Sequence, residues 1–167
     1  MKRNILLLFY ALVLSVSCIK DKPSGADLAI GDALPDFQIE MNDGSVVSSE
    51  KLSKGVSLIM FFHTTCPDCQ NTLPVIQTVY DEYKDSVSFA LISRAEEFQS
   101  IEEYWTQKGF TMLYSAQSTR EIYELFAQTR VPRVYINKDG IIKAVFTDIP
   151  ETPSYDDIKS VLEGLLL

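Results

Sequence analysis

The sequence predicts an α/β fold in which a central mixed β-sheet is flanked by helices. Short apolar runs rich in strand-forming residues alternate along the chain with segments whose apolar residues recur at helical spacing. The run at residues 56–62 is almost wholly apolar, which is typical of a strand buried on both faces of a sheet. Near the C-terminus, two further runs flank Asn137-Lys138-Asp139-Gly140, which is the pattern of an antiparallel hairpin. Parallel and antiparallel strand pairs are therefore both expected.

The first half of the predicted domain holds a hairpin, two buried strands and a helix. The hairpin is expected because Asn42-Asp43-Gly44-Ser45 is a turn sequence between two strand-like segments. Pro67 suits the first turn of the helix, and Leu73, Ile76 and Val79 share one of its faces. The expected elements are a strand at 38–41, a strand at 46–48, a strand at 56–62, a helix from 67 to about 83 and a strand at 87–92.

The second half continues the alternation and closes with a helix. Gly109 ends the helix that begins near Glu96. The sequence Ser118-Thr119-Arg120-Glu121 is a capping-box pattern, and it should open a helix whose Ile122, Leu125 and Phe126 face inward. Ser154 can cap the final helix. The expected elements are a helix at 96–108, a short strand at 111–114, the helix opened at 118–121, strands at 131–136 and 141–146, and the final helix.

The first 17 residues have the pattern of a signal peptide. A short basic start, Met1-Lys2-Arg3, precedes an apolar run at 5–16 that has the length of a signal h-region. Ser17 and Cys18 follow, and the segment resembles a bacterial lipoprotein signal, in which Cys18 would be acylated and become the first mature residue. Ser15 departs from this pattern because the family usually has Leu or Val there. A cleaved signal without a lipid and an uncleaved anchor remain open alternatives.

Beyond the signal, the chain divides into a tether and one domain. Residues 18–29 are polar and rich in residues that break secondary structure, as expected of a tether, and folding should begin near Ile30 and continue to Leu167. The formal charge of -8 becomes -10 once Lys2 and Arg3 are removed. This acidic balance argues against a nucleic acid or an anionic membrane surface as a partner.

Two of the three cysteines, in Cys66-Pro67-Asp68-Cys69, lie where the strand at 56–62 gives way to a helix. A thiol at a helix start is surrounded by unpaired backbone N–H groups and the positive end of the helix dipole, and both favour the thiolate. The spacing lets the second thiol attack a mixed disulfide formed by the first, which releases the partner reduced. We assign attack to Cys66 and resolution to Cys69. The Asp68 carboxylate disfavours thiolate charge and so predicts a reductant.

Further motifs accompany this dithiol. They are Gly31-Asp32-Ala33-Leu34-Pro35-Asp36-Phe37, a strand ending in Phe61-Phe62, Pro74 five residues beyond Cys69, and Val131-Pro132 before a strand. Residues 31–165 thereby resemble the extracytoplasmic, membrane-tethered thioredoxin-like proteins of the TlpA and ResA type, within the AhpC/TSA and Redoxin grouping. The resemblance implies a thioredoxin-like fold with an N-terminal β-hairpin and a central αβ insertion. It implies a thiol-disulfide oxidoreductase that needs no cofactor and no metal ion.

The resemblance also implies site residues beyond the two cysteines. Pro132 would be cis and lie against the dithiol, and the backbone of Val131 would pair with an extended substrate segment flanked by Pro67 and Asp68. The buried acid of the family is missing at both of its usual places, where this chain has Met60 and Thr72. No acid replaces it by spacing, so Asp68, a solvent molecule or an unplaced residue must move the proton.

His63, the only histidine, lies three residues before Cys66. It is a candidate for tuning the thiolate, it could join Cys66 and Cys69 as a soft metal site, or it could be an ordinary loop histidine with a backbone partner. A peroxidase is not expected, because Ile59 and His63 occupy the Pro and Thr positions of the peroxiredoxin signature PxxxTxxC.

The predicted function is a thiol-disulfide oxidoreductase of the bacterial cell envelope, facing the periplasm or the surface. We expect a monomer, anchored in the membrane through a lipid at Cys18, that takes electrons from a membrane thiol carrier and acts on protein disulfides. Two alternatives stay open. One is a thioredoxin-like chaperone that handles copper or another metal, and the other is a thioredoxin-like binding module without catalytic turnover.

Overall fold

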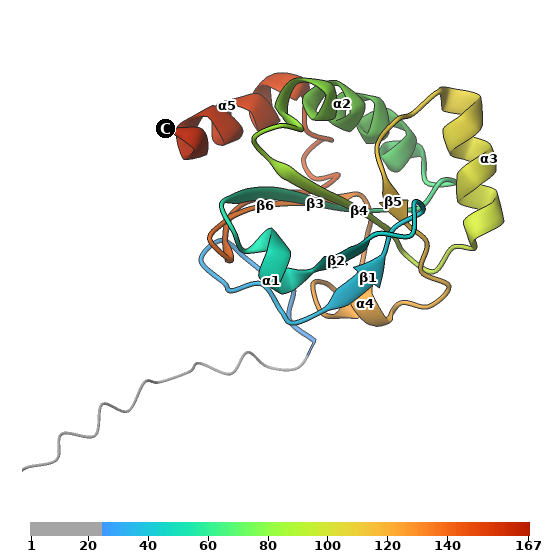
Figure 1. Cartoon of the computed structure of the whole chain (residues 1–167), viewed down its shortest axis with the longest axis horizontal. Helices are drawn as coiled ribbons and strands as arrows, with labels where there is room; N and C mark the ends of the chain where they lie inside the picture. Colours follow the sequence, from blue (N-terminus) through green and yellow to red (C-terminus); the bar gives the residue numbers. More distant parts are fainter. Residues whose placement is uncertain (1–24) are drawn as a thin grey trace, which may run out of the picture.

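The computed structural model describes residues 25–167, and Figure 1 shows its arrangement. Cys18, the predicted signal peptide and the first part of the predicted tether lie outside the described residues. The strands are β1 (Gln38–Glu40), β2 (Val46–Ser48), β3 (Val56–Phe62), β4 (Ser88–Ser93), β5 (Tyr114–Ser115), β6 (Arg133–Lys138) and β7 (Ile141–Phe146). The helices are α1 (Ser49–Leu52), α2 (Pro67–Tyr83), α3 (Phe98–Lys108), α4 (Glu121–Glu124) and α5 (Tyr155–Leu166).

The main sheet has five strands in the order β5-β4-β3-β6-β7, and β1 and β2 form a separate antiparallel hairpin. The central strand β3 pairs in parallel with β4 and antiparallel with β6, which confirms the predicted mixed sheet. All seven residues of β3 are buried, as its apolar sequence predicts. Because β3 and β4 are parallel, the loops that follow them leave the same edge of the sheet.

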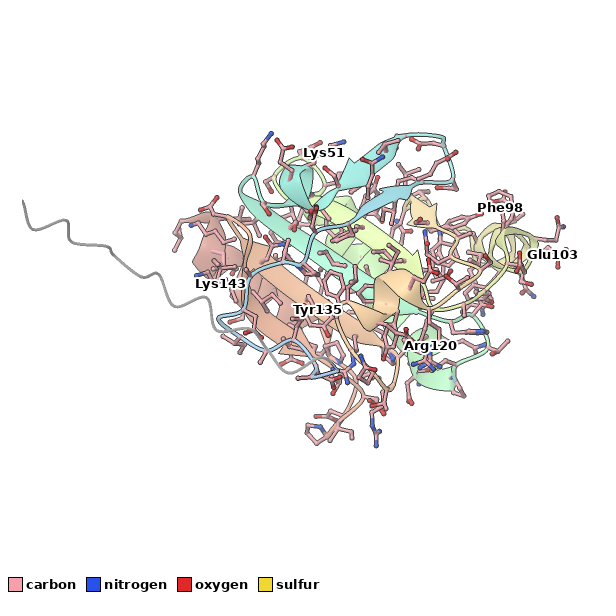
Figure 2. The ribbon with its side chains drawn as sticks, turned by 90° about the horizontal axis from the view of Figure 1, so that it is seen from below. Lys51, Phe98, Glu103, Arg120, Tyr135 and Lys143 are labelled. Atoms are coloured by element: carbon pink, nitrogen blue, oxygen red, sulfur yellow. The ribbon has the colours of Figure 1, made fainter. Side chains whose placement is uncertain are left out.

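Helices cover both faces of the main sheet (Figure 1). Helices α2 and α5 lie on one face, while α1, α4 and the β1-β2 hairpin lie on the other. Phe61 of β3 points to the α4 face, where it contacts Tyr123 at 5.4 Å and Phe126 at 4.8 Å between ring centroids. Tyr135 of β6, labelled in Figure 2, joins this cluster 5.3 Å from Phe126. Buried aromatic side chains therefore hold α4 to the sheet.

Helix α3 lies beside β5 at the edge of the sheet (Figures 1 and 2). Phe62 follows Phe61 in β3 and therefore points to the opposite face, where its ring lies 5.0 Å from that of Trp105. The Trp105 indole N–H donates to the Met112 carbonyl at 2.9 Å. As predicted, α3 ends at Gly109, which takes the left-handed conformation with φ 69°. This inserted helix is thus attached to the strand that leads to the dithiol.

The turn between β6 and β7 consists of Asp139 and Gly140, with φ of 53° and 78°. Two consecutive residues of positive φ characterise the hairpin turn whose twist matches that of the flanking strands. Asp139 also links the turn to the start of β3, because its side chain accepts from the Gly55 N–H at 3.1 Å. A β-carbon at Gly140 would lie 2.8 Å from Ser53 Oγ, so a larger residue would displace the Ser53 side chain as well as strain the backbone.

Several segments differ from the sequence-based expectations. Strand β5 was expected at 111–114, strand β6 was expected at 131–136, and the short helix α1 was not expected. The helix predicted from the capping-box pattern is only α4, its N-cap Arg120 makes no side-chain cap bond, and Leu125 is 42% exposed instead of facing inward. The C-terminal end of α4 is tightened by a hydrogen bond of the 3₁₀ type, from the Phe126 N–H to the Tyr123 carbonyl at 2.9 Å. The Phe126 carbonyl then accepts from Leu28 at 2.8 Å. The Phe126 carbonyl thus bonds to Leu28 and not to a further turn of α4. Leu28, which lies within the predicted tether, therefore contacts the domain.

None of the helices formed by residues 25–167 combines the length and the apolar character needed to cross a bilayer.

Candidate functional site

The two cysteines of the candidate site lie at the junction of β3 and α2. Cys66 is the N-cap residue of α2, with an extended backbone, and Pro67 is the first helical residue, where its missing N–H has no cost. The Cys66 N–H donates to the His63 carbonyl at 3.0 Å, and the Cys66 carbonyl accepts from Gln70 at 2.9 Å. Both backbone groups of Cys66 are therefore held, and its half-buried sulfur stands at the positive end of the helix dipole.

A distant loop supplies the second wall of the site. The Cys66 thiol donates to the Val131 carbonyl at 3.4 Å, and the Val131-Pro132 peptide bond is cis. Arg130, which precedes this pair, has φ 70°, and its carbonyl accepts from the Tyr123 hydroxyl at 2.5 Å. The loop before β6 is thus fixed by the aromatic cluster under the sheet. The structure thus brings the Val131 carbonyl to Cys66, next to the cis bond to Pro132 that the resemblance implies, and the catalytic roles of these residues stay predictions.

Cys69 occupies the first turn of α2 and is fully buried, with 0% of its side chain exposed. Removal from water raises the pKa of the Cys69 thiol, because burial disfavours the charged form. A hydrogen bond from the His63 backbone N–H to the sulfur acts in the opposite direction, and burial is the larger effect. Cys69 is therefore a neutral thiol near pH 7, and its attack on a mixed disulfide requires help with deprotonation.

A buried acid, Glu96, contacts the loop that leads to the dithiol. Its side chain is 6% exposed, and it accepts hydrogen bonds from the Thr64 N–H at 2.9 Å and from the Thr64 hydroxyl. Thr64 follows the end of β3, and Glu96 follows the end of β4. Because these strands are parallel, their C-terminal ends meet at one edge of the sheet, and this is the signal that could have paired the two residues. The sequence left Asp68, a solvent molecule or an unplaced residue to move the proton, and Glu96 is a candidate for the unplaced residue through its contacts with Thr64 and His63.

His63 contacts the same carboxylate. Its Nδ1 lies 3.6 Å from Glu96 Oε2, 3.3 Å from the Thr65 N–H nitrogen and 3.0 Å from the Thr65 hydroxyl. The histidine therefore has a backbone partner, and its ring and its peptide group both belong to the loop that reaches the two cysteines. Within the described part of the chain, no group of three or more His, Cys, Asp or Glu side chains is arranged to hold a metal ion.

The remaining predicted positions lie on the first turns of α2. Pro67 is exposed and Asp68 is half-buried, so both border the surface beside Cys66. Thr72, at one of the two places where the family has its acid, is fully buried, and its hydroxyl donates to the Asp68 carbonyl at 2.8 Å. That hydroxyl is therefore already used within the helix.

Comparisons with known proteins agree with this geometry. The family model for Redoxin matches residues 29–162. A thiol-disulfide oxidoreductase ResA from Oceanobacillus iheyensis is 26% identical over 151 residues, covering 86% of this chain and 78% of that protein. A second ResA, from Geobacillus kaustophilus, is 25% identical over 141 residues, covering 83% of this chain and 79% of that protein.

Solved structures show the same architecture. A solution structure from Bacteroides thetaiotaomicron superposes with a TM-score of 0.75 at 21% identity, covering 87% of this chain and 94% of that one. A thiol:disulfide interchange protein of the thioredoxin family from Chlorobium tepidum gives 0.70 at 21% identity, covering 85% and 100%. The fold is that of thioredoxin, with the hairpin β1-β2 before it and α3 and β5 inserted within it.

Proposed function

Because this chain belongs to the Redoxin family and has a thioredoxin-like fold, we propose that it is a thiol-disulfide oxidoreductase that reduces protein disulfides through Cys66 and Cys69. The observation that carries the proposal is the unequal placement of the two thiols. Cys66 is half-buried at the helix start and contacts the Val131 carbonyl, whereas Cys69 is fully buried behind it. The ResA relatives, which are named thiol-disulfide oxidoreductases, support the same chemistry.

The reaction proceeds in two exchanges. The Cys66 thiolate attacks one sulfur of a substrate disulfide, a bond forms between Cys66 and that sulfur, and the other substrate sulfur leaves as a thiolate that takes up a proton. Cys69 then loses its proton and attacks the Cys66 sulfur. The Cys66-Cys69 disulfide forms, the bond to the substrate breaks, and the second substrate sulfur leaves with the electron pair. The substrate gains two electrons and two protons, and the protein loses them.

The loop at Val131 gives the substrate a place to bind. In the free protein the Val131 carbonyl accepts from the Cys66 thiol. Once Cys66 is deprotonated or joined to a partner, this carbonyl is free to accept from the backbone N–H of an extended substrate segment. Pro67 and Asp68 border the same surface, and Asp68 favours the disulfide form of the pair and hence a reducing role.

The location and the anchor are further parts of the proposal. The sequence of residues 1–18 supports export and acylation at Cys18, which would hold the domain at a membrane of the cell envelope. A membrane thiol carrier would then restore the reduced dithiol after each turnover. Globomycin sensitivity of processing and mass spectrometry of the mature N-terminus test the lipid, and an unmodified Cys18 in the mature protein would refute it.

Reduction of insulin disulfides by the purified chain tests the activity. Wild type should reduce insulin, Cys66→Ser should be inactive, and Cys69→Ser should accumulate a mixed disulfide through Cys66. Equal inactivity of wild type and Cys66→Ser, with partner binding retained, would overturn the oxidoreductase and leave a binding module. A measured reduction potential near that of the strongly oxidising thiol oxidases would contradict the reducing role.

A further inference from the structure

A groove with a volume of about 250 Å³ lies between the β1-β2 hairpin, the C-terminal end of α2 and the start of β4. The buried part of its lining is apolar and consists of Met41, Val47, Leu52 and Val87. The rings of Tyr80 and Phe89, with centroids 5.2 Å apart, form an aromatic wall. Lys84 of the lining follows α2, about 27 Å along the helix from Cys66, so the groove is separate from the dithiol.

The groove is built into the sheet, because β4 has a neighbouring strand along only part of its outer edge. Strand β3 pairs with all of β4, whereas β5 pairs with it only at Leu91 and Ile92. The segment before β5 bonds to α3 instead, since the Met112 carbonyl accepts from the Trp105 indole N–H at 2.9 Å. Among the described residues, no strand covers the outer edge of β4 at Ser88, and the groove opens there.

Two lysines give the groove a positive rim. The exposed side chains of Lys51, on α1, and Lys84 both belong to the lining, which includes no Asp or Glu. The Lys84 Nζ lies 5.8 Å from the centroid of the Tyr80 ring, which places this ammonium beside the aromatic wall. The chain as a whole carries a formal charge of -8. Two cations beside an apolar floor on an acidic protein favour a ligand with an apolar body and one negative charge.

The two lysines are not equivalent. Hydrogen bonds from Ser45 and, to a smaller extent, the charge of Lys51 lower the pKa of the exposed Asp43 in the hairpin turn. Lys51 therefore shares its charge with an acid of the protein, and Lys84 should contribute more to the binding of an anion.

The volume limits the size of the apolar body. A cavity of about 150 Å³ holds benzene with its six carbon atoms, so a groove of about 250 Å³ accommodates about ten carbon atoms. The buried lining comes from three elements, namely the hairpin, α1 and the segment that leads into β4. A flexible unbranched chain can contact all three, whereas a rigid ring covers only one part of the floor.

We propose that this groove binds a straight-chain carboxylate of about eight to ten carbon atoms, with its chain on the apolar floor and its carboxylate at Lys84 and Lys51. Binding is non-covalent and does not involve the dithiol. The site is therefore independent of the proposed oxidoreductase function, and either proposal can fail without the other.

Calorimetric titration of the whole reduced protein at pH 7 with hexanoate, octanoate and decanoate tests the apolar floor. Each added methylene should tighten binding about two- to fourfold up to decanoate. Octylammonium has the same chain as octanoate with the opposite charge, and it should bind about tenfold more weakly or not at all. Amide chemical shifts should move in the hairpin, in α1 and at the start of β4, and those of the loop before Cys66 should stay unchanged.

Three lysine-to-methionine variants test the rim, because each removes one positive charge and keeps an unbranched side chain. Lys84→Met should weaken the binding of octanoate about tenfold, and Lys51→Met should weaken it less. Lys143→Met is the matched control, since Lys143 is exposed on β7, the opposite edge strand of the sheet (Figure 2). This control should bind octanoate as wild type does, and all three variants should reduce insulin at the wild-type rate.

The proposal is overturned if none of the three acids binds, if affinity does not rise with chain length, or if octylammonium binds as tightly as octanoate. It also fails if Lys84→Met and Lys143→Met bind octanoate equally well, or if the shifts cluster at the dithiol. An extended peptide of alternating Val and Glu represents another occupant, which would pair with the open edge of β4. Binding of this peptide without binding of decanoate would assign the groove to a protein partner and refute the carboxylate site.

Discussion

Replacing Glu96 with alanine should destabilise the protein and loosen the loop that carries the dithiol. The Glu96 carboxylate accepts two hydrogen bonds from Thr64, and both residues are 6% exposed. Removing the carboxylate leaves the Thr64 N–H buried without an acceptor, because water reaches the position poorly. The loop concerned also provides the His63 N–H that bonds to the Cys69 sulfur.

The magnitude follows from these contacts. A hydrogen bond to a charged group contributes about 1.5–3 kcal/mol, and a buried unpaired donor costs about 1–3 kcal/mol. The cost of burying the carboxylate itself offsets part of this gain. We therefore expect Glu96→Ala to lower the free energy of unfolding by about 2–4 kcal/mol. Glu96→Gln keeps an acceptor for the Thr64 N–H and should lose about half as much.

Urea denaturation of the reduced protein measures these changes, with Glu103→Ala as the control. Glu103 lies on the exposed side of α3 (Figure 2), where it accepts from Gln99 at 2.8 Å, so its removal should change stability by less than about 0.5 kcal/mol. The reasoning is refuted if Glu96→Ala is as stable as the control, or if Glu96→Gln is as damaging as Glu96→Ala. Faster alkylation of Cys69 in Glu96→Ala would show that the loop has opened.

Three further predictions concern pH and the turns. Burial raises the pKa of Cys69. The reduced protein should therefore keep its full stability below about pH 8.5, where the thiol is protonated in the folded and the unfolded state, and lose stability at higher pH, where the unfolded thiol ionises first. In urea titrations over the same pH interval, Cys69→Ala should lose less stability than wild type. Hydrogen bonds from Ser154 lower the pKa of Asp157, so the stability of the protein should fall as the pH drops below about 4. If the melting temperature of Asp157→Asn falls as much as that of wild type over this pH range, the prediction is contradicted. Gly140→Ala should lower the free energy of unfolding by about 2 kcal/mol or more, because a β-carbon would lie 2.8 Å from Ser53 Oγ. Gly44→Ala, at a similar φ but with open space around the added carbon, should lower it by about 1 kcal/mol. Equal losses of the two variants in urea denaturation would exclude the clash at Gly140.

Much of the fold was predictable because its signals are local. The bounds of β3 and α2 agree with the sequence, since a run of apolar residues and a proline at the first helical position act through near neighbours. Gly109 and Ser154 end and begin their helices for the same reason. The capping-box pattern at Ser118 failed, since α4 begins only at Glu121 and its N-cap is Arg120, which makes no side-chain cap bond.

The sequence by itself determined the dithiol and its position at a strand-to-helix junction, and the resemblance to a known family added the cis bond at Pro132. Only the tertiary structure decided what surrounds the sulfurs. Glu96 reaches Thr64 across 32 residues, and Cys66 reaches Val131 across 65. The first contact depends on the register of the parallel pair β3-β4, and the second depends on the register of the antiparallel pair β3-β6. The spacing of residues along the chain does not encode such pairings, because they arise when separate elements share one buried core.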